Sequence, residues 1–354
     1  MRIAQIATLY TPVRQHDSGS VEQLVWLLTR ELTRLGHEVT VFGAAGSETC
    51  GEVVVTQPGA YAQHGAFNDW QLCEWINLCR AVEQSDRFDV LHSHAYLRGL
   101  PFETFTRTPM VHTMHIMPGR DEASLWEMMP GTCVTAISHY QWRDFPEHQP
   151  AAVIYHGVDE QEFPLRAEPD DYVCYLGRFI PEKGPRAAIA AARALGLRLV
   201  LAGAPSDYFH ASIKPLLDDA AIQYAGFVNG PARSRLLGGA RALLYPVREA
   251  EPFGLVLAEA MMCGTPVASM RLGAVPEIVD EGITGSYAAS PAEFPQAVLR
   301  ALDLDRRAVR ARAEARFTAE RMAREYAAVY RRLACGVAGI GGIGAAAPTQ
   351  EGHG

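Results

Sequence analysis

Two glutamates separated by seven residues stand in the segment best suited to chemistry. A proline follows Glu251, which suits a first helical turn, and the apolar run up to Glu259 would continue that helix. We therefore expect Glu251 at the entrance of a helix and Glu259 about two turns inside it. The outward-pointing backbone amides of Phe253, Gly254 and Leu255 could then bind an anion. For an isolated pair, a helix cap and a solvated glutamate would be the simpler interpretation.

A second group of charged residues follows a predicted strand, Tyr172–Leu176. Arg178 and Lys183 stand in the loop after it. Preplaced cations of this kind stabilise the negative charge that builds up when a diphosphate departs. The alternative is an exposed ion pair between Glu182 and Lys183, which would do little. The chain has 30 arginines and only two lysines, so one of its two compact cations lies in this loop.

Both segments resemble the retaining glycosyltransferases of family 4 (glycosyl transferases group 1), which have the GT-B fold. Residues 251–267 match the family's pattern of two glutamates, E-P-F-G-L-x-x-x-E-A-x-x-x-G-x-P-V, nearly throughout. Residues 177–184 match its G-R-x-x-x-x-K-G loop. The resemblance implies a nucleotide-sugar donor bound by the C-terminal half. It also implies that Glu251, Arg178 and Lys183 act in catalysis.

The donor site that the resemblance implies can be divided by role. Arg178, Lys183 and the amides of residues 253–255 would bind the diphosphate. Glu259 would accept hydrogen bonds from the ribose hydroxyls, and Glu251 would orient the transferred sugar. Transfer would retain the anomeric configuration by a front-face mechanism, in which the leaving phosphate accepts the acceptor's proton.

The N-terminal half carries weaker matches to the same family. Gly19 stands where the family usually has two glycines, which let the loop approach the donor's phosphate and sugar, so the resemblance implies that Gly19 binds the donor; Ser20 replaces the second glycine. The family's D-x-x-H-x-H and T-x-H strand ends match segments that end in His94 and His115. The resemblance implies that His115 contacts the transferred sugar and acts in catalysis, where with Glu251 it would orient that sugar and favour its cationic transition state. We place His92, His94 and Trp126 on the acceptor side.

Two alternative sites remain open at this stage. His92, His94, His112 and His115 could together bind zinc, since two strand-end histidine pairs could converge. The competing interpretation is that they bond to neighbouring backbone, and we expect neither a metal nor a cofactor. Residues 339–344 fit G-x-G-x-x-G, but a helix precedes them where a dinucleotide site needs a strand.

The elements around these motifs alternate between strand and helix. Apolar residues recur with the 3.6-residue helical period over Val21–Leu35, and short apolar strands separate such segments in both halves. We predict an α/β chain with two doubly wound, Rossmann-like parallel-sheet domains facing a cleft. The predicted domains are 1–162, which would bind the acceptor, and 163–316, which would bind the donor. A helix at about 317–333 would return to the first domain, and a Gly/Ala-rich tail, 335–354, would be disordered.

The charge of the chain limits the kinds of partner that it can bind. The net charge is −8, which disfavours nucleic acid as a partner. Residues 1–160 hold 10 arginines, no lysine and 19 acidic residues, a net of −9, and the remainder is +1. An acidic acceptor domain does not favour anionic membranes, and no apolar run of about 18 residues is present. We therefore expect a cytoplasmic enzyme with a soluble, neutral or cationic acceptor.

The expected function is transfer of a hexose from a nucleotide sugar. UDP is the expected donor base, and GDP is also compatible with these residues. A nucleotide-sugar 2-epimerase of the same fold is an alternative, because it too needs a cleft with carboxylates and histidines. A third possibility is an inactive protein that only binds a sugar nucleotide.

Overall fold

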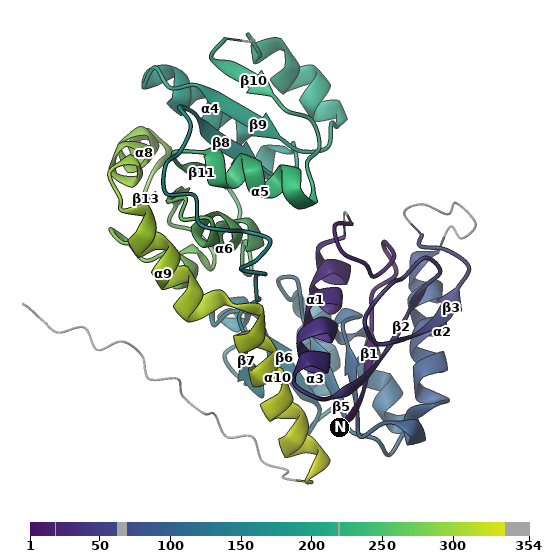
Figure 1. Cartoon of the computed structure of the whole chain (residues 1–354). Helices are drawn as coiled ribbons and strands as arrows, with labels where there is room; N and C mark the ends of the chain where they lie inside the picture. Colours follow the sequence, from purple (N-terminus) through teal and green to yellow (C-terminus); the bar gives the residue numbers. More distant parts are fainter. Residues whose placement is uncertain (18, 62–68, 219, 337–354) are drawn as a thin grey trace, which may run out of the picture.

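The computed structural model describes residues 1–17, 19–61, 69–218 and 220–336. These residues form two domains, each built on a parallel sheet, as predicted. Figure 1 shows the domains as two lobes, with the C-terminal helices running from one lobe to the other. Nearly all of the predicted tail lies outside the described residues.

The N-terminal domain is a seven-stranded sheet in the order β3-β2-β1-β4-β5-β6-β7. Its strands are short and mostly buried, as expected for a parallel sheet covered on both faces. The strands are β1 (Arg2–Ile6), β2 (Glu38–Ala44), β3 (Glu52–Gln57), β4 (Val90–Ser93), β5 (Met110–Thr113), β6 (Cys133–Ala136) and β7 (Ala152–Val153). The helices are α1 (Ser20–Arg34), α2 (Trp70–Val82), the 3-10 helix η2 (Tyr96–Phe105) and α3 (Arg120–Glu127).

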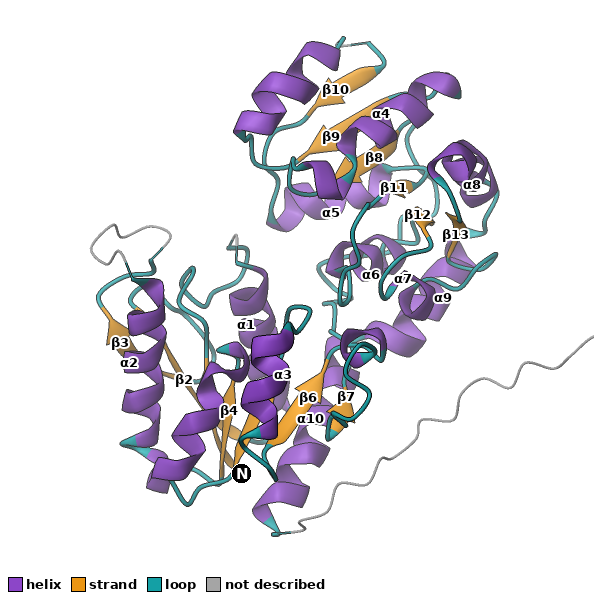
Figure 2. Cartoon of the chain, turned by 180° about the vertical axis from the view of Figure 1, so that it is seen from behind, coloured by secondary structure: helices purple, strands orange, loops and turns teal. Residues whose placement is uncertain are grey.

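The C-terminal domain is a six-stranded sheet in the order β10-β9-β8-β11-β12-β13. Its strands are β8 (Val173–Leu176), β9 (Leu199–Ala202), β10 (Ile222–Tyr224), β11 (Leu243–Tyr245), β12 (Val267–Met270) and β13 (Gly285–Ala288). The helices are α4 (Pro185–Ala194), α5 (Gly230–Gly239), α6 (Leu255–Met262), α7 (Val275–Ile278), α8 (Phe294–Leu302), α9 (Arg306–Phe317) and α10 (Ala319–Ala334). Helices lie on both faces of this sheet (Figure 2).

Strand order reverses once in each sheet, between β1 and β4 and between β8 and β11. Ligands of doubly wound domains bind at such switch points, beyond the carboxyl ends of the strands. Gly19 and His94 follow β1 and β4, while Arg178 and Glu251 follow β8 and β11. The predicted site residues therefore stand at both switch points.

The last helix, α10, completes the N-terminal domain. Its buried face carries Met322, Tyr326 and Tyr330, which pack in one core cluster with Ile3, Val90 and other strand residues. The predicted helix at 317–333 is slightly displaced, because α9 ends at Phe317 and Thr318 caps α10. Thr318 has extended backbone, and its hydroxyl accepts a hydrogen bond from the Arg321 amide at 3.3 Å. The cap lets the chain turn between the domains.

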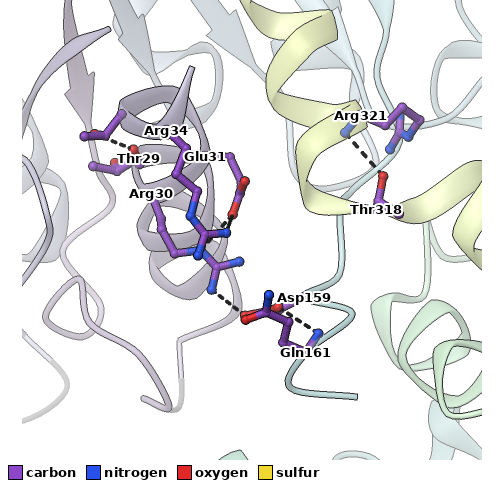
Figure 3. Close-up of polar contacts among 9 residues, drawn as sticks. Thr29, Arg30, Glu31, Arg34, Asp159, Gln161, Thr318 and Arg321 are labelled. Carbon is purple, nitrogen blue, oxygen red and sulfur yellow. Dashed lines mark hydrogen bonds and ion pairs between the residues drawn. The ribbon is translucent and has the colours of Figure 1, made fainter. Parts of the chain in front are cut away.

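The two crossings between the domains lie side by side. Val158 pairs with Thr318 in a parallel bridge, and the Val158 amide donates to the Phe317 carbonyl at 2.8 Å. Arg30 of α1 forms an ion pair with Asp159 in the first crossing (Figure 3). The Asp159 carboxylate also accepts from the Gln161 amide at 3.0 Å. These contacts fix the hinge to the start of the N-terminal domain.

Some elements differ from the sequence-based prediction. β3 and α2 are not among the predicted elements. Between β9 and β10 the chain forms two short helical turns, η5 (Phe209–Ile213) and η6 (Lys214–Leu216), instead of one longer helix, because Pro215 cannot donate the hydrogen bond that a continuing helix needs. Within the described ranges, no helix is both long enough and apolar enough to cross a membrane.

Candidate functional site

A lysine, a glutamate and a tyrosine form the centre of the C-terminal switch point. The Lys183 ammonium forms an ion pair with one carboxylate oxygen of Glu251. The Tyr245 hydroxyl donates a hydrogen bond to the other oxygen. The Lys183 and Glu251 side chains are 18% and 22% exposed, so a ligand can reach both. The structure thus joins two predicted catalytic residues with a tyrosine at the end of β11.

Close backbone packing positions this cluster. The Arg248 amide donates to the Glu182 carbonyl at 2.7 Å, which ties the two loops together. A Cβ at Gly184 would collide with the Pro246 carbonyl, and a Cβ at Gly273 would lie 2.5 Å from the Glu251 amide nitrogen. Only glycine permits these approaches at the positive φ angles of 69° and 65°.

The helix after Glu251 begins later than the sequence suggests. α6 starts at Leu255, and Gly254 precedes it with a left-handed φ of 80°. Glu251 therefore lies in the loop before the helix, and Glu259 is one turn inside rather than two. In the described part of the chain, the amides of Phe253, Gly254 and Leu255 have no hydrogen-bond partner. They are free to meet an anion at the predicted place.

Glu259 lies in a cavity between the domains. It is buried on α6 and forms an ion pair with Arg233 of α5. Burial raises the pKa of Glu259, and the Arg233 charge opposes this shift. The cavity encloses about 50 Å³ and is lined by both domains, including Gln23 and Leu27 of α1, Glu259, and Asn229 just before α5. Arg178 stands at the end of β8 with an exposed side chain.

Four histidine rings form a buried column from the N-terminal sheet to the donor loop. The ring centroids of His92 and His94 lie 4.0 Å apart, those of His94 and His115 5.3 Å, and those of His115 and His156 5.5 Å. His156 then meets the Phe253 ring at 4.9 Å. The column links the predicted sugar contact His115 to the loop after Glu251.

Hydrogen bonds in this column set the proton positions. The Gln5 carbonyl oxygen bonds to His94 Nε2 at 2.7 Å, so His94 carries its proton there. His94 Nδ1 then accepts from His115 Nε2 at 3.0 Å. His115 Nδ1 is left as a buried acceptor with no hydrogen-bond partner among the residues that the structure describes. Burial lowers the pKa of His115 to about 3, so the ring is neutral near pH 7.

The loop after β1 reaches across to the second domain. Its residue His16 has a left-handed φ of 64° and lies 3.1 Å from the Glu162 carboxylate. The Asn229 side chain donates to the His16 carbonyl at 2.9 Å. Gly19 precedes α1, and any Cβ there would collide with Glu22 and Thr11. Gly19 therefore permits close packing of this loop.

Three of the predicted acceptor-side residues are buried in packing positions. His92 bonds through both nitrogens, to Tyr330 Oη and Thr113 Oγ1, each at 2.7 Å. His94 is likewise fully bonded and unexposed. Trp126 lies in a core cluster, with its ring 4.7 Å from Trp142. These placements favour structural roles for all three.

The histidines do not converge as metal ligands. Within the ranges that the structure describes, the one group of three close ligand atoms is Glu127, Glu147 and His148, which includes none of these four histidines. His112 instead bonds to Glu103 at 2.8 Å. The zinc interpretation of the four histidines therefore has no geometric support here.

Sequence reasoning missed several residues of the site. Tyr245 and Arg233 bond the two signature glutamates, and His156 continues the histidine column. Tyr245 ends β11, and the carboxyl end of a parallel strand is a usable signal. Arg233 is one arginine among 30, and nothing local distinguishes it.

Both halves of the chain match family models. Residues 158–317 match "Glycosyl transferases group 1", and residues 21–162 match "Glycosyltransferase Family 4". A curated relative, D-inositol 3-phosphate glycosyltransferase of Mycobacterium avium (strain 104), is 28% identical over 348 residues. That alignment covers 81% of this chain and 82% of the relative.

Solved structures share the two-domain fold. AviGT4, a glycosyltransferase involved in avilamycin A biosynthesis, superposes with a TM-score of 0.72 at 24% identity, covering 95% of this chain and 98% of that one. Sucrose-phosphate synthase from Thermosynechococcus elongatus gives 0.75 at 18%, covering 95% and 100%. HepE from Anabaena, solved in complex with UDP-glucose, gives 0.70 at 18%, covering 94% and 99%.

Proposed function

Because this chain belongs to the group 1, family 4 glycosyltransferases and has their GT-B fold, we propose that it transfers a hexose from a UDP-sugar with retention of configuration. The family assignment makes it a glycosyltransferase that uses a nucleotide sugar. The observation that carries the finer proposal is the Lys183–Glu251–Tyr245 cluster beside three free amides. HepE, which shares the fold, was solved with UDP-glucose.

The diphosphate of the donor would compete with Glu251 for Lys183. Lys183 would turn toward the phosphates together with Arg178 and the free amides, as a set of donors placed where charge develops. Glu251, still held by Tyr245, would then accept a hydrogen bond from the transferred sugar. Glu259 would exchange Arg233 for the ribose hydroxyls. Each carboxylate in the site is thus occupied by a cation or hydroxyl until substrate arrives.

On the other side of the cleft, His115 supplies a hydrogen-bond acceptor for the transferred sugar. Its unpartnered Nδ1 would accept a hydrogen bond from a hydroxyl of the transferred sugar. We propose no resident metal, since the cations and amides of the chain provide the charge stabilisation. The bond from the anomeric carbon to the phosphate oxygen breaks as the acceptor oxygen bonds to that carbon. The acceptor's proton passes to the departing phosphate.

Thermal unfolding with a panel of nucleotide sugars tests the donor. UDP-glucose should raise the melting temperature more than GDP-glucose at equal concentration, because a ligand that binds only the native state stabilises it. The transfer product should show the same anomeric configuration as the donor by proton NMR. An inverted product, or a larger shift with GDP-glucose, would refute the respective part of the proposal.

Incubation with donor alone separates the two alternative functions. A 2-epimerase would convert the UDP-sugar to its epimer without an acceptor. An inactive binding protein would raise its melting temperature with UDP-glucose and release no UDP under any condition. Slow UDP release in chelator-treated protein, faster with an acceptor, is the outcome that we expect.

A further inference from the structure

A buried carboxylate in the N-terminal domain lacks the partners that such a group normally needs. Glu74 of α2 is 1% exposed, and neither carboxylate oxygen has a hydrogen-bond partner among the described residues. The nearest cation is Arg98 of η2, whose Nη1 lies 3.8 Å from Glu74 Oε2. Buried carboxylates are normally hydrogen-bonded, so both oxygens of Glu74 could still accept hydrogen bonds from a ligand.

Aromatic rings lie around Arg98, the cation beside this carboxylate. Arg98 lies over the Trp70 ring at 4.4 Å and near the Tyr96 ring at 5.5 Å. Tyr61 lies 6.1 Å from Trp70 and 5.7 Å from Tyr10, measured between ring centroids. Tyr10 is 49% exposed and Arg98 is 29% exposed, so the cluster reaches the surface through these side chains.

The cluster adjoins the proposed sugar site. The Tyr96 ring meets the His115 ring edge-on at 6.3 Å. A second buried acid, Glu22, accepts hydrogen bonds from Thr8 Oγ1 at 2.7 Å and from the Tyr10 amide at 2.9 Å, just beyond β1. The carboxylates therefore lie at the same sheet edge as His115, on the side of the acceptor domain.

Resting on the function proposed above, we propose that the Glu74–Arg98 cluster with its aromatic wall is the acceptor subsite, and that it takes a polyol ring without a phosphate. Glu74 would accept hydrogen bonds from ring hydroxyls, and Arg98 would donate to them. The rings of Tyr10 and Tyr61 would cover the apolar face of the sugar. One arginine beside two acids offers a phosphate little net positive charge.

The charge of the surrounding domain agrees with this selection. Residues 1–160 carry a net charge of −9 and no lysine. The relative described above is by its name an enzyme of D-inositol 3-phosphate, so its acceptor carries a phosphate. We infer that this chain has the opposite preference and takes an acceptor that is neutral or bears an amine.

Matched acceptor pairs test the proposal with UDP-glucose as donor. The pairs are myo-inositol and inositol 3-phosphate, glucose and glucose 6-phosphate, and glucosamine and glucosamine 6-phosphate. We expect kcat/KM at least tenfold higher for the unphosphorylated member of the pair that is used best. A preference for the phosphate, or no transfer to any acceptor by protein that still hydrolyses UDP-glucose, overturns it. Absence of UDP-glucose binding and hydrolysis would instead refute the proposed function.

A variant assigns the preference to Glu74. Glu74→Gln keeps the shape and removes the charge, so the KM for the unphosphorylated acceptor should rise at least tenfold while the KM for UDP-glucose changes less than twofold. Glu83→Gln, an exposed glutamate at the end of the same helix, is the control and should change neither KM. An unchanged acceptor KM in Glu74→Gln overturns the assignment.

Discussion

At the scale of single residues, the site holds its charges in pairs before any ligand arrives. Lys183 neutralises Glu251, and Arg233 neutralises Glu259. Burial raises the pKa of Glu259, so an unpaired charge there would be costly. Binding the donor exchanges these partners rather than desolvating bare charges. The site is thereby preorganised at a modest cost in stability.

Removing the lysine should affect turnover far more than folding. Lys183→Ala should lower kcat by about 10²–10³-fold, the effect of losing one preplaced charge-stabilising donor. The free energy of unfolding should change by about 1 kcal/mol or less, because the ion pair is partly solvated. Steady-state kinetics and urea unfolding measure the two effects.

The only other lysine of the chain gives a matched control. Lys214 is exposed in the second domain, and Lys214→Ala should leave kcat unchanged. Equal losses of kcat in both variants would contradict a specific role for Lys183.

At the scale of elements, α10 belongs to the second half of the sequence but to the first domain in space. Its Tyr330 hydroxyl accepts from the Gln5 amide at 3.2 Å and bonds to His92 Nδ1 at 2.7 Å. The same Gln5 side chain orients His94, which in turn orients His115. The helix therefore supports the proposed sugar contact through three hydrogen bonds. Positioning of this kind depends on buried groups that have no alternative partners.

Loss of the Tyr330 hydroxyl should destabilise the N-terminal domain. Tyr330→Phe leaves the buried His92 Nδ1 without its partner, at a cost of about 1–3 kcal/mol in the free energy of unfolding. Urea unfolding measures this cost. Tyr208→Phe is the control, because the Tyr208 hydroxyl makes no hydrogen bond in the described chain. A Tyr330→Phe variant as stable as the control would show that the bond contributes little.

At the scale of the whole molecule, the chain crosses between the domains twice, near Val158 and near Thr318. The crossings run side by side as a parallel bridge, and Gly157 lies where they touch. A Cβ at Gly157 would lie 2.7 Å from the Ala319 Cα, which is backbone and cannot move aside cheaply. Burial acts to raise the pKa of Asp159 in this hinge, but the Arg30 guanidinium holds it below its ordinary value.

Widening the hinge should destabilise the molecule. Gly157→Ala forces the two crossings apart, and overpacking of this kind costs about 1–3 kcal/mol in the free energy of unfolding. Calorimetry should show a lower melting temperature. A variant within 0.5 kcal/mol of the native chain, on the order of an ordinary surface substitution, would show that the crossings separate freely.

The buried histidines predict acid sensitivity of the whole fold. Burial is the first cause that lowers the pKa of His92, His94, His115 and His156. Their folded pKa values lie below the unfolded value of about 6.5, so the folded state binds fewer protons. The stability that these neutral rings contribute is full above pH 6.5 and is lost as the pH falls below it.

A histidine variant isolates this effect. Between pH 7.0 and 5.5, protonation of the unfolded state costs about 1.3 kcal/mol per buried histidine. His115→Asn should therefore reduce the loss of unfolding free energy over this range by about that amount, as measured by urea unfolding at both pH values. His210→Asn, at an exposed position, should leave the loss unchanged. An equal loss in all three proteins would contradict the buried-histidine account.

The sequence predicted features that depend on neighbours along the chain. The two parallel-sheet domains follow from the alternation of apolar strands and helices. Gly19, Arg178 and Glu251 follow strands that flank the points where the strand order reverses. The Lys183 and Glu251 loops were found because their residue spacing is local. The later start of α6 was not predicted, because Gly254 takes a left-handed conformation that the residue pattern does not reveal.

The tertiary structure alone decided which remote side chains meet. Glu74 and Arg98 come from different elements, Tyr330 lies 325 residues from Gln5, and neither pair has a sequence signal. The sequence therefore predicted acceptor-side positions at His92, His94 and Trp126, all of which are buried, while Glu74 carried no local signal. Burial and the presence or absence of a partner depend on how distant segments pack, and these two properties distinguish a poised carboxylate from a surface one.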